Sequence, residues 1–272
     1  MLRVLVDSGC SIKLEECEKY NIELIPLNIL LGDKEYLDGI NLSMDEFYKF
    51  LIDEKGFPKT SQPNLQEIEE KVNKYVGEGD DVVILTISSK ISGTNNAIKR
   101  LFEGNKKVKV LDSCLAVGGM RLIVNEINKN RNKSLDEIEI EVKKLIPRIK
   151  VMAIPETLDY LFRGGRLSRM EWLIGSMLKI KPIIGFKDGK VSVLTKKIGL
   201  KSGMKYIAES LKECDENYEI IPSYTYDRKN LQMLKDITDK KYLSQMKVED
   251  HLDPAIGCHW GPNAFGYIFV TK

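Results

Sequence analysis

Three short segments carry the side chains best suited to binding an anion. They are the hydroxyl-rich run Thr60-Ser61-Gln62-Pro63, the serine-rich run of residues 88–94, and the histidine-containing turn Gly257-Cys258-His259-Trp260-Gly261-Pro262. We expect each hydroxyl-bearing segment to lie just before a helix, where free backbone N–H groups and hydroxyl donors converge on a carboxylate or phosphate. None of the segments contains a metal cage or an evident nucleophile–base pair, so the expected chemistry is recognition of an oxyanion.

The serine-rich segment has the most informative surroundings. Residues 82–87 form a β-branched run typical of a buried strand, and a helical stretch begins at Asn95. Ligands of open α/β sheets lie at the carboxyl ends of strands, which favours Ser92 and Gly93 as contacts. Gly93 lets the backbone approach closely, and the helix dipole adds roughly half a positive charge there. The alternative is that this segment only caps a helix, as serine and threonine commonly do.

Strand and helix patterns alternate along the chain and predict the elements that position these segments. Residues 2–6 and 108–111 are predicted as further buried strands, and residues 22–31 as an extended stretch before a turn at Gly32-Asp33. A capping side chain followed three residues later by glutamate predicts helices that begin near Ser43, Asn64 and Ser134. The helix after Asn64 places residues 60–63 in an extended loop at its N-terminus.

These patterns predict an α/β protein of two domains. The chain has 272 residues, against about 150 for an ordinary domain. Residues 134–149 are predicted as one amphipathic helix and 151–154 as a new strand, so we place the boundary there. Domain 1–150 is expected to hold a parallel sheet flanked by helices. Domain 151–272 is expected to be α/β with a mixed sheet, because Asp188-Gly189 predicts a hairpin between residues 183–186 and 191–195.

The composition of the chain indicates which partners and which cellular compartment to expect. Forty-two Lys and Arg against forty Asp and Glu leave a net charge of +2, too small to attract nucleic acid by bulk charge. No apolar run approaches the roughly 18 residues of a membrane span, and the first residues show no signal-peptide pattern. We therefore expect a cytoplasmic protein without stable membrane insertion.

The cysteines and the histidine leave an enzymatic alternative open. Five cysteines without a C-x-x-C pair indicate neither a disulfide framework nor a zinc ribbon. A small hydrolase or phosphotransferase could use Ser92 or Cys258 with His259. Against it, the sequence has no Walker loop and no G-x-S-x-G elbow. A nucleotide-binding module is a third alternative, but Asp7-Ser8-Gly9 stands where G-x-G-x-x-G would follow the first strand.

Five segments in this order resemble the DegV family of bacterial fatty-acid-binding proteins over nearly the whole chain. They are the three segments above, Asp7-Ser8 after the first strand, and residues 161–166 before Lys181-Pro182-Ile183. The resemblance implies a carrier that binds a long-chain fatty acid, uses no cofactor and has no catalytic group of its own. It implies that Thr60 and Ser92 hold the carboxylate, that Ser61, Gly93 and His259 lie beside it, and that the acyl chain is buried between the domains.

The resemblance also implies further contacts and a protein partner. A stretch containing Met177, Leu178, Ile180 and Gly185 would border the acyl tunnel, although core packing is the simpler role for each. A fatty acid kinase would receive the bound acid for acyl-phosphate formation.

Two substitutions and a group of three arginines bear on these implications. Gly199 stands where the family carries an arginine linked to engaging the kinase, and Asn263 where the family carries glycine. Asparagine tolerates left-handed backbone angles, so we expect the turn at Asn263 to survive. Finally, Arg163, Arg166 and Arg169 suggest an anionic surface partner, with helix capping and a solvated rim as the alternative.

Overall fold

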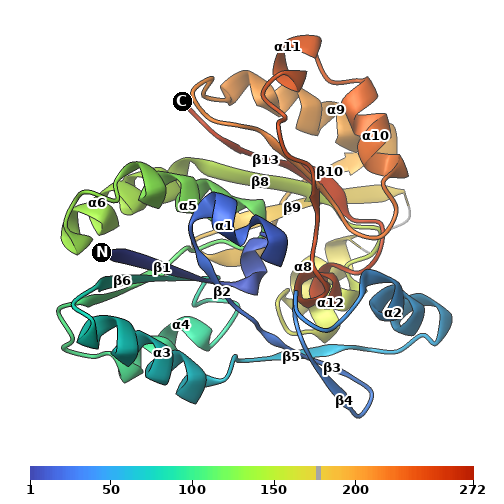
Figure 1. The fold of residues 1–272 in the computed structure, drawn as a ribbon. Coiled ribbons are helices and arrows are strands. Elements are labelled where there is room, and N and C mark those ends of the chain that lie inside the picture. The colour runs from blue at the N-terminus through green and yellow to red at the C-terminus, as the bar shows by residue number, and fades with distance from the viewer. Residues whose placement is uncertain (176–178) are drawn as a thin grey trace.

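A computed structural model describes residues 1–175 and 179–272 of the protein. Strands form three sheets, and helices and sheets are stacked in layers (Figure 1). A parallel four-stranded sheet is flanked by helices and a second, six-stranded sheet is mixed, which confirms the predicted fold class. No helix in the described ranges is both long and apolar enough to cross a membrane.

The parallel sheet has the strand order β2-β1-β6-β7. Alternate residues of its strands face opposite sides, as the period of two requires. Leu5 and Ile84 pack in a core with α3 (Leu65–Gly77) and α4 (Thr94–Leu101). Val6 and Leu85 face α5 (Gly118–Lys129) and α6 (Leu135–Leu145) on the other side. The strands are β1 (Leu2–Asp7), β2 (Glu23–Ile25), β6 (Asp81–Thr86) and β7 (Val108–Asp112).

The mixed sheet has the order β10-β9-β8-β13-β11-β12, and only the β11–β12 pair is parallel. The predicted hairpin is confirmed, because β9 and β10 pair antiparallel around Asp188 and Gly189. Both turn residues have left-handed φ angles, 50° and 79°, as a tight hairpin turn requires. The strands are β8 (Ile149–Ile154), β9 (Ile180–Lys187), β10 (Lys190–Ile198), β11 (Ile221–Tyr224), β12 (Asp250–His251) and β13 (Phe265–Val270).

Both faces of the mixed sheet are covered. Phe265 and Tyr267 pack in a core with α9 (Leu200–Ser210) and α10 (Lys229–Asp236). Ile268 lies on the other face, in the large core that also contains α5 and residues of the parallel sheet. Figure 1 accordingly shows α5 and α6 between the two sheets and α9 and α10 beyond the second sheet. The two sheets share a core, and the domain boundary at residue 150 stays a prediction.

A third sheet, of order β4-β3-β5, was not predicted. It consists of β3 (Asn28–Leu31), β4 (Lys34–Leu37) and β5 (Lys59–Ser61). The stretch 22–31 is thus divided between two sheets, and Thr60 lies in a strand opposite Ile29 rather than in a loop. A strand of three residues is too short to show a periodic pattern, which explains the error.

The predicted helix starts are confirmed by their caps. Ser43 accepts from the Glu46 N–H at the start of α2 (Met44–Tyr48), Asn64 accepts at the start of α3, and Ser134 accepts at the start of α6. The helix predicted over 134–149 ends earlier, at Leu145, because the segment around Pro147 forms a separate 3-10 turn and β8 begins at Ile149.

The remaining helices are short. The α-helices are α1 (Cys17–Tyr20), α7 (Asp159–Arg163), α8 (Arg169–Gly175), α11 (Lys240–Leu243) and α12 (Pro254–Trp260). Single 3-10 or π turns are η1 (Ser8–Cys10), η2 (Leu14–Glu16), η3 (Lys49–Asp53), η4 (Ile146–Arg148) and η5 (Leu211–Glu213). The predicted histidine turn is therefore partly wrong, since His259 lies in the last turn of α12 and Gly261, with φ 70°, ends that helix.

Candidate ligand-binding site

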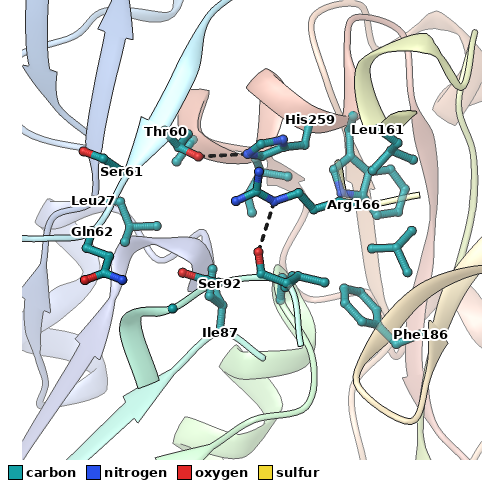
Figure 2. Close-up of a pocket in the computed structure, with 17 residues that line it drawn as sticks. Leu27, Thr60, Ser61, Gln62, Ile87, Ser92, Leu161, Arg166, Phe186 and His259 are labelled. Carbon is teal, nitrogen blue, oxygen red and sulfur yellow. Dashed lines mark hydrogen bonds between the residues drawn. The ribbon is translucent and has the colours of Figure 1, made fainter. Parts of the chain in front are cut away.

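A cavity of about 290 Å³ is lined by all five residues that were predicted to contact or lie beside the ligand carboxylate. Thr60, Ser61, Ser92 and Gly93 come from the first half of the chain, and His259 comes from the second. Figure 2 shows this cavity with its polar side chains converging from β5, the loop before α4, and α12. The volume is near the lower end of the range for sites that hold one small molecule.

Thr60 and His259 form the direct link across the cavity. The Thr60 Oγ1 lies 2.9 Å from the His259 Nε2, joining β5 to α12. Burial, together with the charge of Arg166, lowers the pKa of His259 to about 4, so its imidazole is neutral at neutral pH. The other ring nitrogen, Nδ1, is buried and has no hydrogen-bond partner in the described structure.

Ser92 and Gly93 shape the start of α4. The Thr94 N–H donates to the Ser92 Oγ at 3.3 Å, and the Ser92 and Thr94 hydroxyls lie 3.0 Å apart. Gly93 is the N-cap of α4, so Ser92 forms a local turn just before the helix and also lines the cavity. A Cβ on Gly93 would stand 2.4 Å from the Gln62 Nε2, so glycine is needed for the Gln62 amide to reach this position. A ligand role for Ser92 and Gly93 stays a prediction.

Arg166 is the cavity residue whose role the sequence left unresolved. Its Nε donates to the Ile91 carbonyl at 3.0 Å and its Nη1 to the Gly164 carbonyl at 2.5 Å. Figure 2 shows the guanidinium between His259 and Ser92. Burial lowers the pKa of Arg166, yet none of the ion pairs among described residues includes it. Among the described residues, the positive charge of Arg166 in this cavity thus has no carboxylate partner.

Two glycines allow this placement of Arg166. Gly165 has a left-handed φ of 75°, and the N–H groups of Arg166 and Leu167 both donate to the Leu161 carbonyl. A Cβ on Gly164 would stand 2.6 Å from the His259 Nδ1, so only glycine permits this close approach.

The two neighbouring arginines have a different environment. Arg163 is exposed and lies 4.2 Å from the centre of the Phe57 ring, and Arg169 is exposed at the start of α8. Of the three arginines, Arg166 thus lines the cavity, whereas Arg163 and Arg169 are exposed. The spacing of arginines cannot show which one turns inward, because that depends on the φ angle of Gly165 and on packing against α12.

Apolar side chains line the rest of the cavity. Leu161 and Phe186 lie on the opposite side of Arg166 from Ser61 and Gln62 (Figure 2). The Ser61 hydroxyl turns away from His259, as expected for the residue next to Thr60 in a strand. The cavity therefore combines polar groups with apolar surface, which matches an amphiphile.

The residues predicted to border an acyl tunnel are mostly elsewhere. Gly185 lies in β9, where a Cβ would stand 2.0 Å from the Val151 carbonyl oxygen, so close strand packing explains this glycine. Ile180 is half-buried at the start of β9 and is not among the residues lining the cavity. Met177 and Leu178 lie outside the described residues.

The geometry does not form the nucleophile pairs that the enzymatic alternative requires. Cys258 is fully buried away from the cavity, and burial raises the pKa of its thiol well above the ordinary value. The Ser92 side chain is hydrogen-bonded to Thr94, and the His259 side chain to Thr60. In the described ranges, neither Cys258 nor Ser92 is hydrogen-bonded to His259.

Fold and cavity together define an α/β protein with an internal site suited to one amphiphilic ligand. The chain belongs to the DegV family, since the model of that family, described as an uncharacterised protein of the DegV family, matches residues 1–272. A DegV domain-containing protein of Clostridium acetobutylicum is 32% identical over 283 residues, covering 100% of this chain and 99% of that protein. The resemblance found in the sequence is therefore confirmed.

Solved structures show the same fold. The fatty acid binding DegV family protein from Streptococcus agalactiae has a TM-score of 0.90 and 25% identity, covering 100% of this chain and 99% of its own. DegV, a fatty acid binding protein from Bacillus subtilis, has a TM-score of 0.84 and 25% identity with the same coverage. A stearic acid-binding protein from Eubacterium ventriosum, at 22% identity and a TM-score of 0.88 over 100% of this chain and 99% of its own, adds support for the fold alone.

Proposed function

We propose that this protein binds a long-chain fatty acid in the cavity, between the two halves of the chain. The observation that carries the proposal is the Arg166 guanidinium, half-buried and without a carboxylate partner in the described structure, at the edge of an apolar chamber. A buried charge is costly unless it is paired, and a carboxylate ligand supplies the pair. Two solved relatives at 25% identity are fatty acid binding proteins, which supports the same ligand class here.

The carboxylate is expected to contact Arg166, Thr60 and Ser92. A neutral His259 with its proton on Nε2 donates to the Thr60 Oγ1, which leaves the Thr60 hydroxyl hydrogen free to donate to the ligand. The Arg166 Nη2 is the guanidinium nitrogen not used by Ile91 or Gly164. The acyl chain then runs past Leu161 and Phe186, and each buried methylene contributes about 0.8 kcal/mol before ordering costs.

We further propose that the protein is a carrier and performs no reaction of its own. A general base works best with a pKa near the working pH, whereas the pKa of His259 is lowered to about 4. Its Nδ1 has no orienting carboxylate in the described structure, unlike the base of a hydrolytic triad. These features support binding over the hydrolase or phosphotransferase alternative.

The bound acid is proposed to serve a cytoplasmic fatty acid kinase, which would phosphorylate the carboxylate. Arg163 and Arg169 are exposed near the cavity and offer positive charge to such a partner. Gly199 is weaker evidence against a kinase partner than the sequence suggested. Its φ of 78° and ψ of 154° are accessible essentially to glycine alone, so a local backbone requirement explains the missing arginine.

Displacement of a fluorescent long-chain acid tests the ligand class. Palmitic acid should displace the probe completely at one equivalent per chain, and methyl palmitate should do so at least tenfold less well, because the ester has no charge for Arg166. Equal displacement by acid and ester, or no binding of the probe, would overturn the proposal.

A further inference from the structure

A second, larger hollow lies on the outer surface of the helices that cover the mixed sheet. It is an open groove of about 870 Å³, lined by α9, the end of α10, and α11. Figure 1 shows these three helices together, at the other end of the molecule from β3, β4 and β5. The groove therefore shares no lining residue with the ligand cavity.

The floor of this groove is apolar. Met204 and Ala208 contribute from α9, and Met233 and Ile237 from α10 and its C-terminal cap. Met233 is 36% exposed and Ile237 is 52% exposed, and their spacing of four residues places both on one helix face. Large apolar side chains gathered in an exposed hollow mark an interaction surface.

The rim of the groove is basic. Lys201 and Lys205 lie on α9, Lys212 lies on the 3-10 turn η5 that directly follows it, and Lys241 lies on α11. The lining holds these four lysines against two acids, Glu209 and Asp239. Only Lys205 has an ion pair, at 3.7 Å from Glu209, whereas the other three lysines form none with the described carboxylates.

We propose that this groove binds an acidic amphipathic helix of a partner protein. The lysines from Lys201 on α9 to Lys212 on η5 are 11 residues apart, a rise of at least about 16 Å at 1.5 Å per residue, which matches a helix of about three turns. Apolar residues at i, i+3 or i+4, and i+7 of that helix contact the floor, and Asp or Glu on the flank toward α9 pair with the lysines. This inference does not depend on the fatty-acid site.

The distribution of charge favours a helix over an acyl chain or a nucleic acid. A fatty acid has one carboxylate, so it could pair with lysine at only one end of the rim, whereas the lysines are spread along the length of the rim. A nucleic acid would place phosphates beside Glu209 and Asp239 and leave the apolar floor unused. A helix with acids along one flank and apolar residues along another matches both features.

Methyl NMR of protein labelled at its methionines tests the proposal. The protein is first saturated with palmitic acid, so that occupancy of the ligand cavity is constant. The probe is a 14-residue stapled helical peptide with leucines on one face and glutamates on one flank, and the control peptide carries lysines in place of the glutamates. Met204 and Met233 report on the groove, and Met120, buried in the other core, is the internal reference.

The proposal predicts saturable shifts of the Met204 and Met233 methyls with the glutamate peptide, at least tenfold weaker binding of the lysine peptide, and no shift of Met120. The double variant Lys201→Glu/Lys212→Glu should weaken binding of the glutamate peptide at least tenfold. The matched variant Lys99→Glu/Lys106→Glu, at exposed lysines outside the groove, should not. Absence of Met204 and Met233 shifts, equal binding of both peptides, or saturable shifts caused by palmitic acid beyond one equivalent would overturn it.

Discussion

The Thr60 Oγ1 lies 2.9 Å from the His259 Nε2 although 199 residues separate them in the chain. This bond joins the small third sheet to the last turn of α12, so the polar side of the cavity forms only when both halves have folded together. It also sets the direction of the Thr60 hydroxyl hydrogen toward the cavity when His259 donates from Nε2. The proposed carboxylate site therefore depends on a residue that need not touch the ligand.

Replacing Thr60 with valine should weaken fatty-acid binding by about 1.5–3 kcal/mol, because one hydrogen bond to a charged group is lost while side-chain shape is kept. Ser61→Ala is the matched control, since the Ser61 hydroxyl turns away from His259 and Arg166. Adding Ser92→Ala to Thr60→Val should raise the loss to about 3–6 kcal/mol. Isothermal titration with palmitic acid measures the affinity of all three variants. An unchanged affinity in the double variant would show that neither hydroxyl binds the carboxylate.

Arg166→Gln should lower the affinity for palmitic acid by at least tenfold and leave the weak affinity for methyl palmitate unchanged. The stability of the empty protein should fall only through the disrupted hydrogen bonds to the Ile91 and Gly164 carbonyls, because Arg166 forms no ion pair among the described residues. Arg169→Gln, at an exposed position outside the cavity lining, is the control and should bind normally. The assignment of Arg166 fails if the two variants bind palmitic acid alike.

Gly199→Ala should destabilise the fold by about 1–3 kcal/mol, since its φ of 78° is strained for any residue with a Cβ. Steric clash is not the cause, because no described atom lies within 4 Å of the added Cβ. Gly77→Ala makes the opposite test, since this helical glycine has no positive φ and its Cβ would also be in open space. It should stabilise the fold by about 0.5–1 kcal/mol. Urea unfolding of both variants checks the contrast, and destabilisation of equal size would contradict it.

Stability should fall as the pH rises from 6.5 to 8. Burial, with the nearby charge of Asp253, raises the pKa of Asp38 to about 8, and burial raises the pKa of Asp7 and of Asp250 to about 7. The folded chain therefore keeps protons that the unfolded chain has released, and each such proton costs up to about 1.4 kcal/mol per pH unit. The two histidines have lowered pKa values in the folded chain, so they make stability rise with pH. This opposite effect is confined to pH values below about 6.5.

The substitution Asp38→Asn removes one of these buried carboxyl groups and so tests its contribution. The Asp38 Oδ1 accepts from the Ala255 N–H at 3.0 Å, whereas its Oδ2 is buried without a partner in the described structure, so an amide keeps the existing bond. We expect the urea midpoint of this variant to fall less between pH 6.5 and 8 than that of the unmodified protein. Parallel pH profiles for the two proteins would show that Asp38 does not titrate in this window.

The sequence predicted the fold where the signal is local. Capping side chains at Ser43, Asn64 and Ser134 define helix starts, and Asp188-Gly189 defines a hairpin, because each depends on neighbouring residues alone. The left-handed angle predicted for Asn263 is also confirmed, at φ 59°. By contrast, β5 consists of three residues and pairs with a strand some thirty residues earlier, a relationship that no short pattern shows.

The candidate site could likewise be predicted only where the signal is local. The hydroxyl segments could be found because their residue types and their places shortly before helix starts are visible in the sequence, and the structure brings them to one cavity. The inward turn of Arg166 could not be found, since it follows from the φ of Gly165 and from the approach of Gly164 to His259. Both are properties of tertiary packing.

Native mass spectrometry of the protein purified from bacterial cells shows whether the protein binds one long-chain fatty acid per chain. We expect a complex heavier than the 31.0 kDa chain by the mass of one long-chain fatty acid, released on gentle activation, and less abundant for Arg166→Gln. Incubation of delipidated protein with palmitic acid should restore it at one molecule per chain. A nucleotide mass in its place, or failure of delipidated protein to take up palmitic acid, would contradict the account.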